Sequence, residues 1–456
     1  MAKGKKNSVL SLEEKLEYAF VSADEQPYAV PENWCWVKVG SVCVFENGYA
    51  FKADKFSEEG TIPVIRISNI KQNEVDIDSC VYTTETNVDS KFFAKYGDLL
   101  IAMSGATTGK NGVFLSDVPA YVNQRVGNIK VKNEKTLLPK YRNYYIMAME
   151  EEILRGAYGG AQPNISSNKI CDMNMPLPPL AEQQRIVEQI EGLFEKLDEA
   201  EEKVQQVLSK HNIFTQATLR KAFCGELTTE WRKCNNIEVD TWEEKTLASV
   251  CKSIYDGDHM PPPKAEGGIN FLVISNVNKG HLSLEGTRYV PQEYYDSLTE
   301  TRKPELGDVL YTLVGSYGIP VVVDTEKKFC FQRHMGLLKP DLIDTYFLWY
   351  QLQSQEFFNK ATAIANGTAQ LTVPIKGLRQ LTVKCPSFEE QKEIVMILNN
   401  FFEKQNRVKE IAEKTLEGLT AMRKAILTKA FRGELGTNSP DEESAVELLK
   451  RILENK

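Results

Sequence analysis

The 456-residue sequence lacks the motifs that most metal-dependent and hydrolytic enzymes carry. None of its nine cysteines belongs to a C-x-x-C pair, and only four histidines are present. We therefore expect reduced thiols and no zinc site. G-x-S-x-G, H-E-x-x-H and G-x-G-x-x-G are absent. No run of about 18 apolar residues occurs, and the first twenty residues contain no apolar segment of a signal peptide. We expect a cytoplasmic protein without a membrane span.

Positive charge is also not in excess. Lys and Arg number 55 against 63 Asp and Glu, a formal net charge of −8. This balance argues mildly against nucleic-acid binding, because DNA attracts surfaces rich in Lys and Arg. Net charge is a sum, however, and acidic helices can offset a basic face elsewhere.

Residues 97–112, GDLLIAMSGATTGKNG, come nearest to a phosphate-binding P-loop. Only three residues separate Gly105 from Gly109 where the motif needs four, and Asn111 stands where the motif has Ser or Thr. The Pro-Pro runs, LPPL and MPPPK, do not fit the Asn/Asp-Pro-Pro-aromatic tetrad of an amino-methyltransferase. The sequence therefore predicts a binding module with no catalytic or metal residue.

The sequence contains an internal repeat, with an offset of 208 residues between its two copies. PPLAEQQRIVEQIEGLFEK at 178–196 returns as PSFEEQKEIVMILNNFFEK at 386–404, and LRKAFCGEL at 219–227 returns as LTKAFRGEL at 427–435. Gln124-Arg125 falls on Gln332-Arg333, and GDLLIAMSG matches GDVLYTLVG with a small gap. The counterpart of the P-loop-like loop, VGSYGIP, has no lysine. Two duplicated domains, each followed by a long helix, are expected.

Each long helix shows the 4,3 spacing of a coiled-coil seam. Proline precedes both, Gly225 and Gly433 are the expected ends, and about 43 residues give roughly 65 Å. An antiparallel pairing places one domain at each end. His211 and Gln405 interrupt the apolar pattern and are expected to set its register. The predicted seam residues are Ile186, Ile190, Leu193, Leu197, Val204, Val207, Phe214, Ile394, Leu398, Phe401, Val408, Leu419, Met422 and Ile426.

The repeated helix starts PPLAEQQ and PSFEEQK, the segments GGAQPNISSNKI and GTAQLTVPIKGL, and the paired KAFCGEL and KAFRGEL helix ends closely resemble the specificity (S) subunits of type I restriction-modification systems. The resemblance covers residues 31–435. It implies an α+β fold with two mixed α/β target-recognition domains, joined and separated by two long helices in an antiparallel coiled coil. Each domain would read one half of a split, asymmetric DNA site, and the coil would set the spacer.

The resemblance also implies partners. Two methyltransferase (M) subunits would dock on the coil and bring S-adenosylmethionine, and restriction (R) subunits would bring ATP and Mg. This chain would carry no cofactor and would not be an enzyme. The predicted division is 1–30, N-terminal extension; 31–181, target-recognition domain 1; 182–227, first helix; 228–241, linker; 242–389, target-recognition domain 2; 390–435, second helix; 436–456, acidic tail with a short amphipathic helix.

Polar residues near glycine in the repeated loops are the candidates for DNA contact, because such loops let the backbone approach phosphate. In the first domain these are Asn47, Tyr49, Lys52, Ser104, Thr107, Thr108, Lys110, Arg125, Tyr158, Gln162 and Asn164. In the second they are Tyr255, Asp256, His259, Lys264, Ser316, Tyr317, Arg333, His334, Thr368 and Gln370.

Two other functions remain open at this level: a nucleic-acid enzyme with unrecognised motifs, and a coiled-coil scaffold without a role on DNA. For each candidate residue the alternative is a solvated loop position or a turn former. The repeated Gln-Arg pair has the further alternative of stabilising the domain fold.

Overall fold

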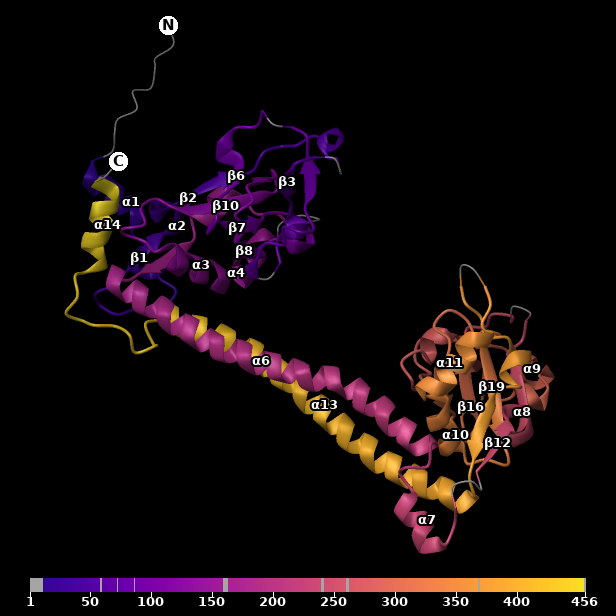
Figure 1. The fold of residues 1–456 in the computed structure, drawn as a ribbon. Helices are drawn as coiled ribbons and strands as arrows, with labels where there is room; N and C mark the ends of the chain where they lie inside the picture. The colour runs from indigo at the N-terminus through magenta and orange to yellow at the C-terminus, as the bar shows by residue number, and fades with distance from the viewer. Residues whose placement is uncertain are drawn as a thin grey trace. The chain divides into compact units, whose positions relative to one another are not determined.

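The computed structural model describes residues 11–57, 60–71, 73–85, 87–158, 163–238, 242–259, 262–367 and 370–454. The chain divides into two compact units (Figure 1): Met1–Glu202 with Leu416–Lys456, and Lys203–Thr415. We call these unit 1 and unit 2. Each unit contains part of both long helices.

Unit 1 is built on a five-stranded sheet of order β2-β10-β7-β8-β4, a four-stranded sheet of order β5-β3-β9-β6, and the pair β1-β11. Its strands are β1 (Cys35–Lys38), β2 (Cys43–Asn47), β3 (Ile62–Ile65), β4 (Asn73–Glu74), β5 (Val81–Thr83), β6 (Phe93–Ala94), β7 (Leu99–Ala102), β8 (Asn111–Val113), β9 (Ala120–Val122), β10 (Val126–Val131) and β11 (Asn174–Leu177). Its shorter helices are α1 (Leu12–Ala19), α2 (Val39–Val42), α3 (Pro139–Ala148), α4 (Glu150–Ala157), α5 (Ser167–Cys171) and α14 (Ala445–Glu454).

Unit 2 repeats this plan with sheets of order β13-β19-β16-β17 and β15-β14-β18 and the pair β12-β20. Its strands are β12 (Glu243–Thr246), β13 (Cys251–Asp256), β14 (Ile269–Leu272), β15 (Arg288–Val290), β16 (Val309–Thr312), β17 (Pro320–Val322), β18 (Phe329–Phe331), β19 (Met335–Pro340) and β20 (Thr382–Cys385). Its shorter helices are α7 (Thr229–Asn235), α8 (Leu247–Val250), α9 (Gln292–Ser297), α10 (Thr345–Leu352), α11 (Gln355–Ile364) and α12 (Ile375–Leu378).

The central strands β7 and β16 are buried along their whole length. β7 is an uninterrupted apolar run, and β16 departs from this pattern only at its last residue, Thr312. Such runs are typical of a strand covered on both faces. Leu99 and Ile101 enter the core that α3 closes, whereas Leu100 and Ala102 enter a second core on the other face. Strand β16 in unit 2 is also covered on both faces. Val309 and Tyr311 enter one core, and Leu310 enters the other.

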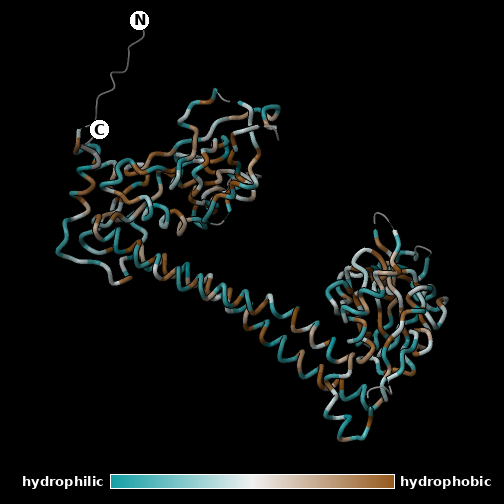
Figure 2. Tube along the Cα trace, in the orientation of Figure 1, coloured by the Kyte–Doolittle hydropathy of each residue, from teal (hydrophilic) through white to brown (hydrophobic). Residues whose placement is uncertain are grey.

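The long helices are α6 (Leu180–Phe223) and α13 (Phe388–Phe431), each 44 residues long. They follow proline and end just before Gly225 and Gly433, whose φ angles are +82° and +72°. They pack antiparallel. Arg423 on α13 hydrogen-bonds to Asp198 and Glu201 on α6, within unit 1. The predicted fold class, helix lengths and antiparallel direction are confirmed. Figure 2 shows hydrophilic and hydrophobic residues alternating along both helices.

The seam is only partly buried. Ile186, Ile190, Ile394, Leu398 and Leu419 are buried, and Leu193, Leu197, Val204, Phe401 and Ile426 are half-buried. The structure departs from the expectation at four positions, which are 44–55% exposed: Val207, Phe214, Val408 and Met422. Two paired helices cover only one face of each other, and a straight helix drifts by about 20° per heptad from a 3.5-residue repeat. His211 and Gln405 are half-buried.

The Glu-Gln pair at the start of each long helix fastens that helix to its unit. Glu182 accepts a hydrogen bond from the Thr437 hydroxyl at 2.7 Å, and Glu390 accepts one from the Thr228 hydroxyl at 2.6 Å. Thr437 follows the end of α13, and Thr228 follows the end of α6. Each carboxylate therefore binds the segment that follows the other long helix.

The adjacent glutamine caps a different helix. The backbone N–H of Leu138, which precedes α3, donates to Gln183 Oε1 at 2.9 Å. In unit 2 the backbone N–H of Asp344, which precedes α10, donates to Gln391 Oε1 at 2.8 Å. Because both side chains are buried, these hydrogen bonds satisfy backbone groups that water cannot reach.

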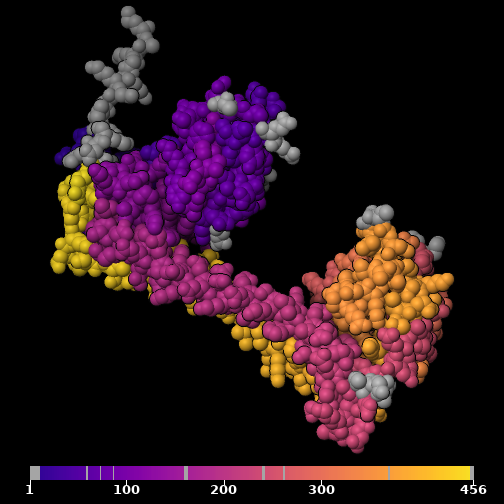
Figure 3. Space-filling view, in the orientation of Figure 1, coloured from indigo at the N-terminus to yellow at the C-terminus, as the bar shows by residue number. Residues whose placement is uncertain are grey.

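The acidic tail completes unit 1. Its helix α14 packs on α1, and the Ala445 N–H donates to Asn33 O at 2.9 Å. Ala445 and Leu449 are fully buried in the core of the unit. The predicted amphipathic helix is confirmed. Figure 3 shows the tail, in yellow, lying against the indigo and purple atoms of unit 1. The segment 228–241, expected to be a linker, contains α7.

Candidate nucleic-acid interface

In unit 2 the structure brings five of the predicted DNA-contact residues into one groove. Its volume is about 520 Å³. The polar lining consists of Asp256, His259, Arg333, His334, Gln370 and Thr372, and the remaining walls are Leu313, Val314, Val373, Pro374 and Ile375. Residues from four separate loops meet here because the ends of neighbouring strands converge.

Backbone hydrogen bonds hold these loops in a row. Asp256, the last residue of β13, lies opposite Gly336 of β19. The Leu313 N–H donates to His334 O at 2.8 Å, and the Val373 N–H donates to Leu313 O at 2.8 Å. We call this series of loop positions, from Asp256 through His334 and Leu313 to Val373, the row of unit 2. The sheet sets the positions of its side chains.

Charges of both signs meet in the groove. Asp256 Oδ2 lies 2.9 Å from His259 Nε2, and Asp256 Oδ1 lies 3.7 Å from Arg302 Nη2. The Arg333 side chain is exposed, and His334 is half-buried. Burial, with a smaller contribution from Arg333, lowers the pKa of His334 below its usual 6.5. The groove thus offers a carboxylate acceptor, a guanidinium donor and a histidine that favours its neutral form.

Unit 1 contains the same row of backbone positions. Asn47, the last residue of β2, lies opposite Gly127 of β10. The Met103 N–H donates to Arg125 O at 2.9 Å, and Ser104 forms a β-bridge with Asn164. Four predicted residues, Asn47, Ser104, Arg125 and Asn164, therefore belong to one row.

The strand pairing corrects the alignment of the two repeats at this point. Asn123 bridges to Tyr49, and Gln332 bridges in the same way to Asp258. Arg125 therefore occupies the position of His334, and Gln124 that of Arg333. A register shift in β13 between Cys251 and Ser253 gives the same offset of 209 at the strand end, where Asp256 corresponds to Asn47. The sequence interpretation, in which the two Gln-Arg pairs coincide, was wrong because the offset between the repeats is not constant along the chain and is 209 at this loop.

Some predicted residues have structural roles instead. Thr108 is 3% exposed, and its hydroxyl donates to backbone carbonyls of Gly105 at 2.7 Å and Pro163 at 3.2 Å. The Thr108 hydroxyl therefore stabilises the turn. Tyr49 packs edge-on against Phe51 at 4.9 Å.

Two further aromatic candidates pack against neighbouring side chains, and one further hydroxyl is buried. The Thr107 hydroxyl oxygen is buried. Tyr317 stacks on Phe358 at 5.4 Å. Tyr255 lies beneath the Arg379 guanidinium, 4.7 Å from ring centre to Cζ.

The remaining candidates are exposed at places outside the two rows: Lys52, Lys110, Tyr158, Lys264 and Ser316. Gln162 and Thr368 lie outside the described residues.

The P-loop-like segment does not lead into a helix. After the turn at Gly105, which has a φ of +78°, Lys110 is followed directly by strand β8. A P-loop needs the N-terminus of a helix at this place to bind phosphate. The loop after β16 has the same positive-φ pair, Gly315 at +71° and Gly318 at +89°. The shared feature is a turn between antiparallel strands.

Arg302 is a functional candidate that the sequence interpretation missed. It lies 3.7 Å from the carboxylate of Asp256 and 4.0 Å from that of Asp258. It lies in a short 3-10 helix, Glu300–Arg302, far from both in the sequence. No spacing or repeat marks it, so only the folded chain brings it to the groove.

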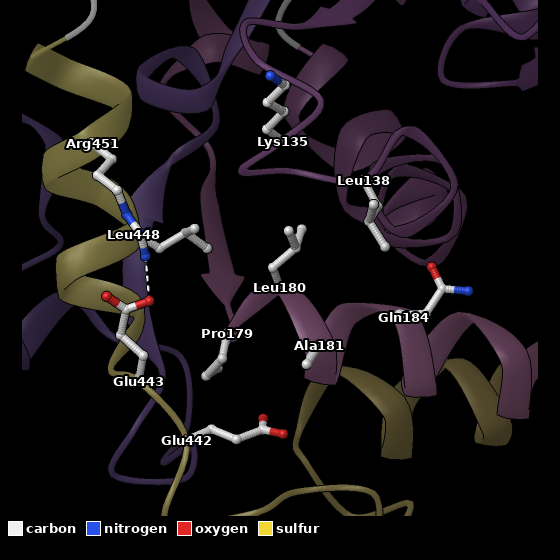
Figure 4. Close-up of a pocket in the computed structure, with 10 residues that line it drawn as sticks. All are labelled: Lys135, Leu138, Pro179, Leu180, Ala181, Gln184, Glu442, Glu443, Leu448 and Arg451. Carbon is white, nitrogen blue, oxygen red and sulfur yellow. Dashed lines mark hydrogen bonds and ion pairs between the residues drawn. The ribbon is translucent and has the colours of Figure 1, made fainter.

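A second hollow, of about 550 Å³, lies in unit 1 between the start of α6 and the tail (Figure 4). Leu138, Leu180 and Leu448 form its apolar wall. Arg451 hydrogen-bonds to Glu443 at its edge. Within the described ranges we find no group of three or more His, Cys, Asp or Glu side chains arranged to hold a metal ion. None of the helices described has the length and apolarity needed to cross a membrane.

The comparison with known families decides the identity of this fold. The type I restriction modification DNA specificity domain matches residues 31–210 and again residues 239–417, one match for each repeat. The chain belongs to the type I restriction-modification specificity subunits. As a specificity subunit it is a non-catalytic, DNA-specificity component of a type I complex.

Known specificity subunits match nearly the full length of this one. The EcoBI specificity subunit of Escherichia coli is 26% identical over 448 residues, which cover 93% of this chain and 92% of that protein. The EcoKI specificity subunit of Escherichia coli strain K12 is 25% identical, with coverage of 93% and 95%.

Two solved structures share the fold. A chain from a study of complex assembly and conformational transition of the type I system has a TM-score of 0.69 at 21% identity, over 90% of this subunit and all of that chain. The HsdS subunit from Thermoanaerobacter tengcongensis has a TM-score of 0.54 at 22% identity, with the same coverage.

Proposed function

We propose that this specificity subunit reads a split, asymmetric DNA sequence, with one half-site read by the loop row of each unit. The observation that carries the proposal is that both rows have the same backbone frame and different side chains. Where unit 1 has Gln124, Arg125 and Ser104, unit 2 has Arg333, His334 and Val314. A shared frame with unequal side chains is what the reading of two different base sequences requires.

The long helices would set the spacer between the half-sites and dock two methyltransferase subunits. In unit 2, Ile213 and Phe214 of α6 and Met396 and Ile411 of α13 are 51–67% exposed. Exposed large apolar side chains on a solvated helix are typical of a protein interface. The duplication of the sequence supports two equivalent docking sites.

The catalytic groups would come from the partners. The methyltransferase subunits would bring S-adenosylmethionine and methylate adenine, and the restriction subunits would bring ATP and Mg. The complex would act on DNA in the cytoplasm.

The decisive experiment compares two matched variants in the complex with the methyltransferase subunits. Arg125→Ala removes a guanidinium from the row of unit 1, and Arg333→Ala removes one from the row of unit 2. Sequencing of methylated sites should show that each variant relaxes one half-site and leaves the other half unchanged. Relaxation of both halves by one variant, or no change by either, would contradict the proposal.

A further inference from the structure

Asn47 in the row of unit 1 and Asp256 in the row of unit 2 occupy the same backbone position. Their side chains differ only in the terminal group, which is an amide in Asn47 and a carboxylate in Asp256. Asn47 ends β2 opposite Gly127, and Asp256 ends β13 opposite Gly336. Amide and carboxylate have nearly the same shape. They differ because the amide offers both a donor and an acceptor, whereas the ionised carboxylate only accepts.

The glycine that follows fixes this position. A Cβ at Gly48 would lie 2.2 Å from Asn123 O, and one at Gly257 would lie 2.3 Å from Phe331 O. Neither backbone can move away without breaking the sheet edge, so the preceding side chain leaves the strand end at the same point in both units.

Neighbouring groups hold Asp256 in place and leave part of it accessible. His259 approaches one carboxylate oxygen at 2.9 Å, and Arg302 lies 3.7 Å from the other. The Asp256 side chain is still 17% exposed and lines the groove beside Arg333. A carboxylate next to an exposed guanidinium matches the edge of a G·C pair, since cytosine N4 donates and guanine O6 and N7 accept.

Asn47 in unit 1 is exposed at the corresponding place. Its amide matches adenine, which presents a donor at N6 and an acceptor at N7 in the major groove. The two units would therefore select different bases at this point, because Asn47 carries an amide nitrogen where Asp256 carries a carboxylate oxygen.

We propose that this position is a base-discriminating position in both units: Asp256 selects cytosine in one half-site and Asn47 selects adenine in the other. The inference rests on the proposed reading of DNA by the two rows. It adds the residue in each row that discriminates and the base that it accepts.

The test exchanges the two groups in the complex with the methyltransferase subunits. Asp256→Asn and Asn47→Asp are each expressed in a host without other adenine methylation, and modified sites are mapped by sequencing. Asp256→Asn should move one position of one half-site from cytosine toward adenine, by roughly ten- to hundredfold in relative modification. Asn47→Asp should produce the reverse change in the other half-site.

Asp258→Asn is the matched control, because it makes the same charge change in the same loop. Asp258 accepts a hydrogen bond from the Tyr294 hydroxyl at 3.2 Å, so this variant should leave the base preference unchanged. Unaltered preference in both exchange variants, or an equal change in the control, would overturn the inference while the half-site reading stands. If instead the wild-type complex modifies no split site, the proposed function itself fails.

Asn47→Asp keeps the inference testable if Asp256→Asn disturbs the groove, because Asn47 is exposed. A shift from adenine to cytosine in that half-site alone would support the assignment, and its absence in a folded variant would refute it.

Discussion

Glu390 accepts hydrogen bonds from three different residues at the junction of α13 with unit 2. It accepts hydrogen bonds from Thr228 at 2.6 Å, from Arg232 at 2.6 Å and from the Trp242 indole at 2.9 Å. Both members of its ion pair with Arg232 are buried. The motif predicted a helix start here, but its partners lie about 150 residues away and could not be read from the sequence.

We expect Glu390→Ala to destabilise unit 2 by about 3–5 kcal/mol, because it leaves Arg232 buried without a counter-ion. Chemical denaturation of the purified chain measures the change. Glu403→Ala is the matched control, since Glu403 makes an exposed pair with Arg407, and should cost less than about 1 kcal/mol. Equal effects of the two would contradict a role of Glu390 in holding the junction.

Lys110 tests whether the loop after β7 meets DNA phosphate. Its side chain is exposed, and it lowers the pKa of Glu150, which burial raises. If Lys110 contacts phosphate, Lys110→Ala should reduce the slope of log K against log salt by about one. Binding of the complex to duplex DNA at several salt concentrations gives the slope. Lys233→Ala, on α7, should leave it unchanged, and an unaltered slope in Lys110→Ala would place that residue away from the phosphates.

His334 should make the stability of unit 2 depend on pH. Its folded-state pKa lies below 6.5 because of burial and Arg333, so the unfolded chain binds the proton more readily. The contribution is full above pH 6.5 and is lost as the pH falls below that value. Denaturation at pH 7.5 and 5.5 should show a smaller difference for His334→Gln than for wild type. His281→Gln, at an exposed site, is the control, and the same difference in all three proteins would refute the assignment.

At the scale of elements, the periodicity of the sequence predicted the length of the long helices correctly but did not predict which seam residues are buried. Both helices run for 44 residues between a proline and a left-handed glycine, as the pattern indicated. The 4,3 spacing also predicted a continuous seam, yet Val207, Phe214, Val408 and Met422 are exposed. Spacing records which residues share a face, whereas burial depends on what covers that face.

Deletion of residues 203–206 from α6 tests the helices as a spacer. Four helical residues span about 6 Å, close to two base-pair steps at about 3.4 Å each. We expect the distance between the half-sites to change and the half-sites themselves to stay the same, as read by sequencing of methylated DNA. Replacement of the same four residues by alanine preserves the length and should preserve the spacer. An unchanged spacer after deletion would count against this role.

At the scale of the whole molecule, unit 1 is completed by residues from the far end of the chain, whereas unit 2 is the continuous segment Lys203–Thr415. Unit 1 contains Leu416–Lys456. Arg185 at the start of α6 hydrogen-bonds to Glu442 at 2.8 Å, and Asn33 donates to Ser439 O at 3.0 Å. The two repeats are therefore not two consecutive folding units, although they are consecutive in the sequence.

Removal of residues 436–456 should destabilise unit 1 selectively. The truncation deletes the buried side chains of Leu448 and Leu449, at about 2–3 kcal/mol each, and breaks the Arg185–Glu442 pair. Hydrogen exchange should rise in the strands of unit 1 and stay constant in those of unit 2, which serve as the internal control. Equal loss of protection in both units, or none in either, would contradict the assignment of the tail to unit 1.

The sequence by itself determined the duplication, the two long helices, the absence of a P-loop and the family, because repeats, periodicity and motif spacing are local properties of the chain. The tertiary structure decided the rest. It joined Glu390 to Arg232, brought Arg302 to Asp256, buried Thr108 and placed Arg125 at the position of His334. These outcomes depend on the packing of residues far apart in the chain, and a one-residue change of register alters which side chains face each other.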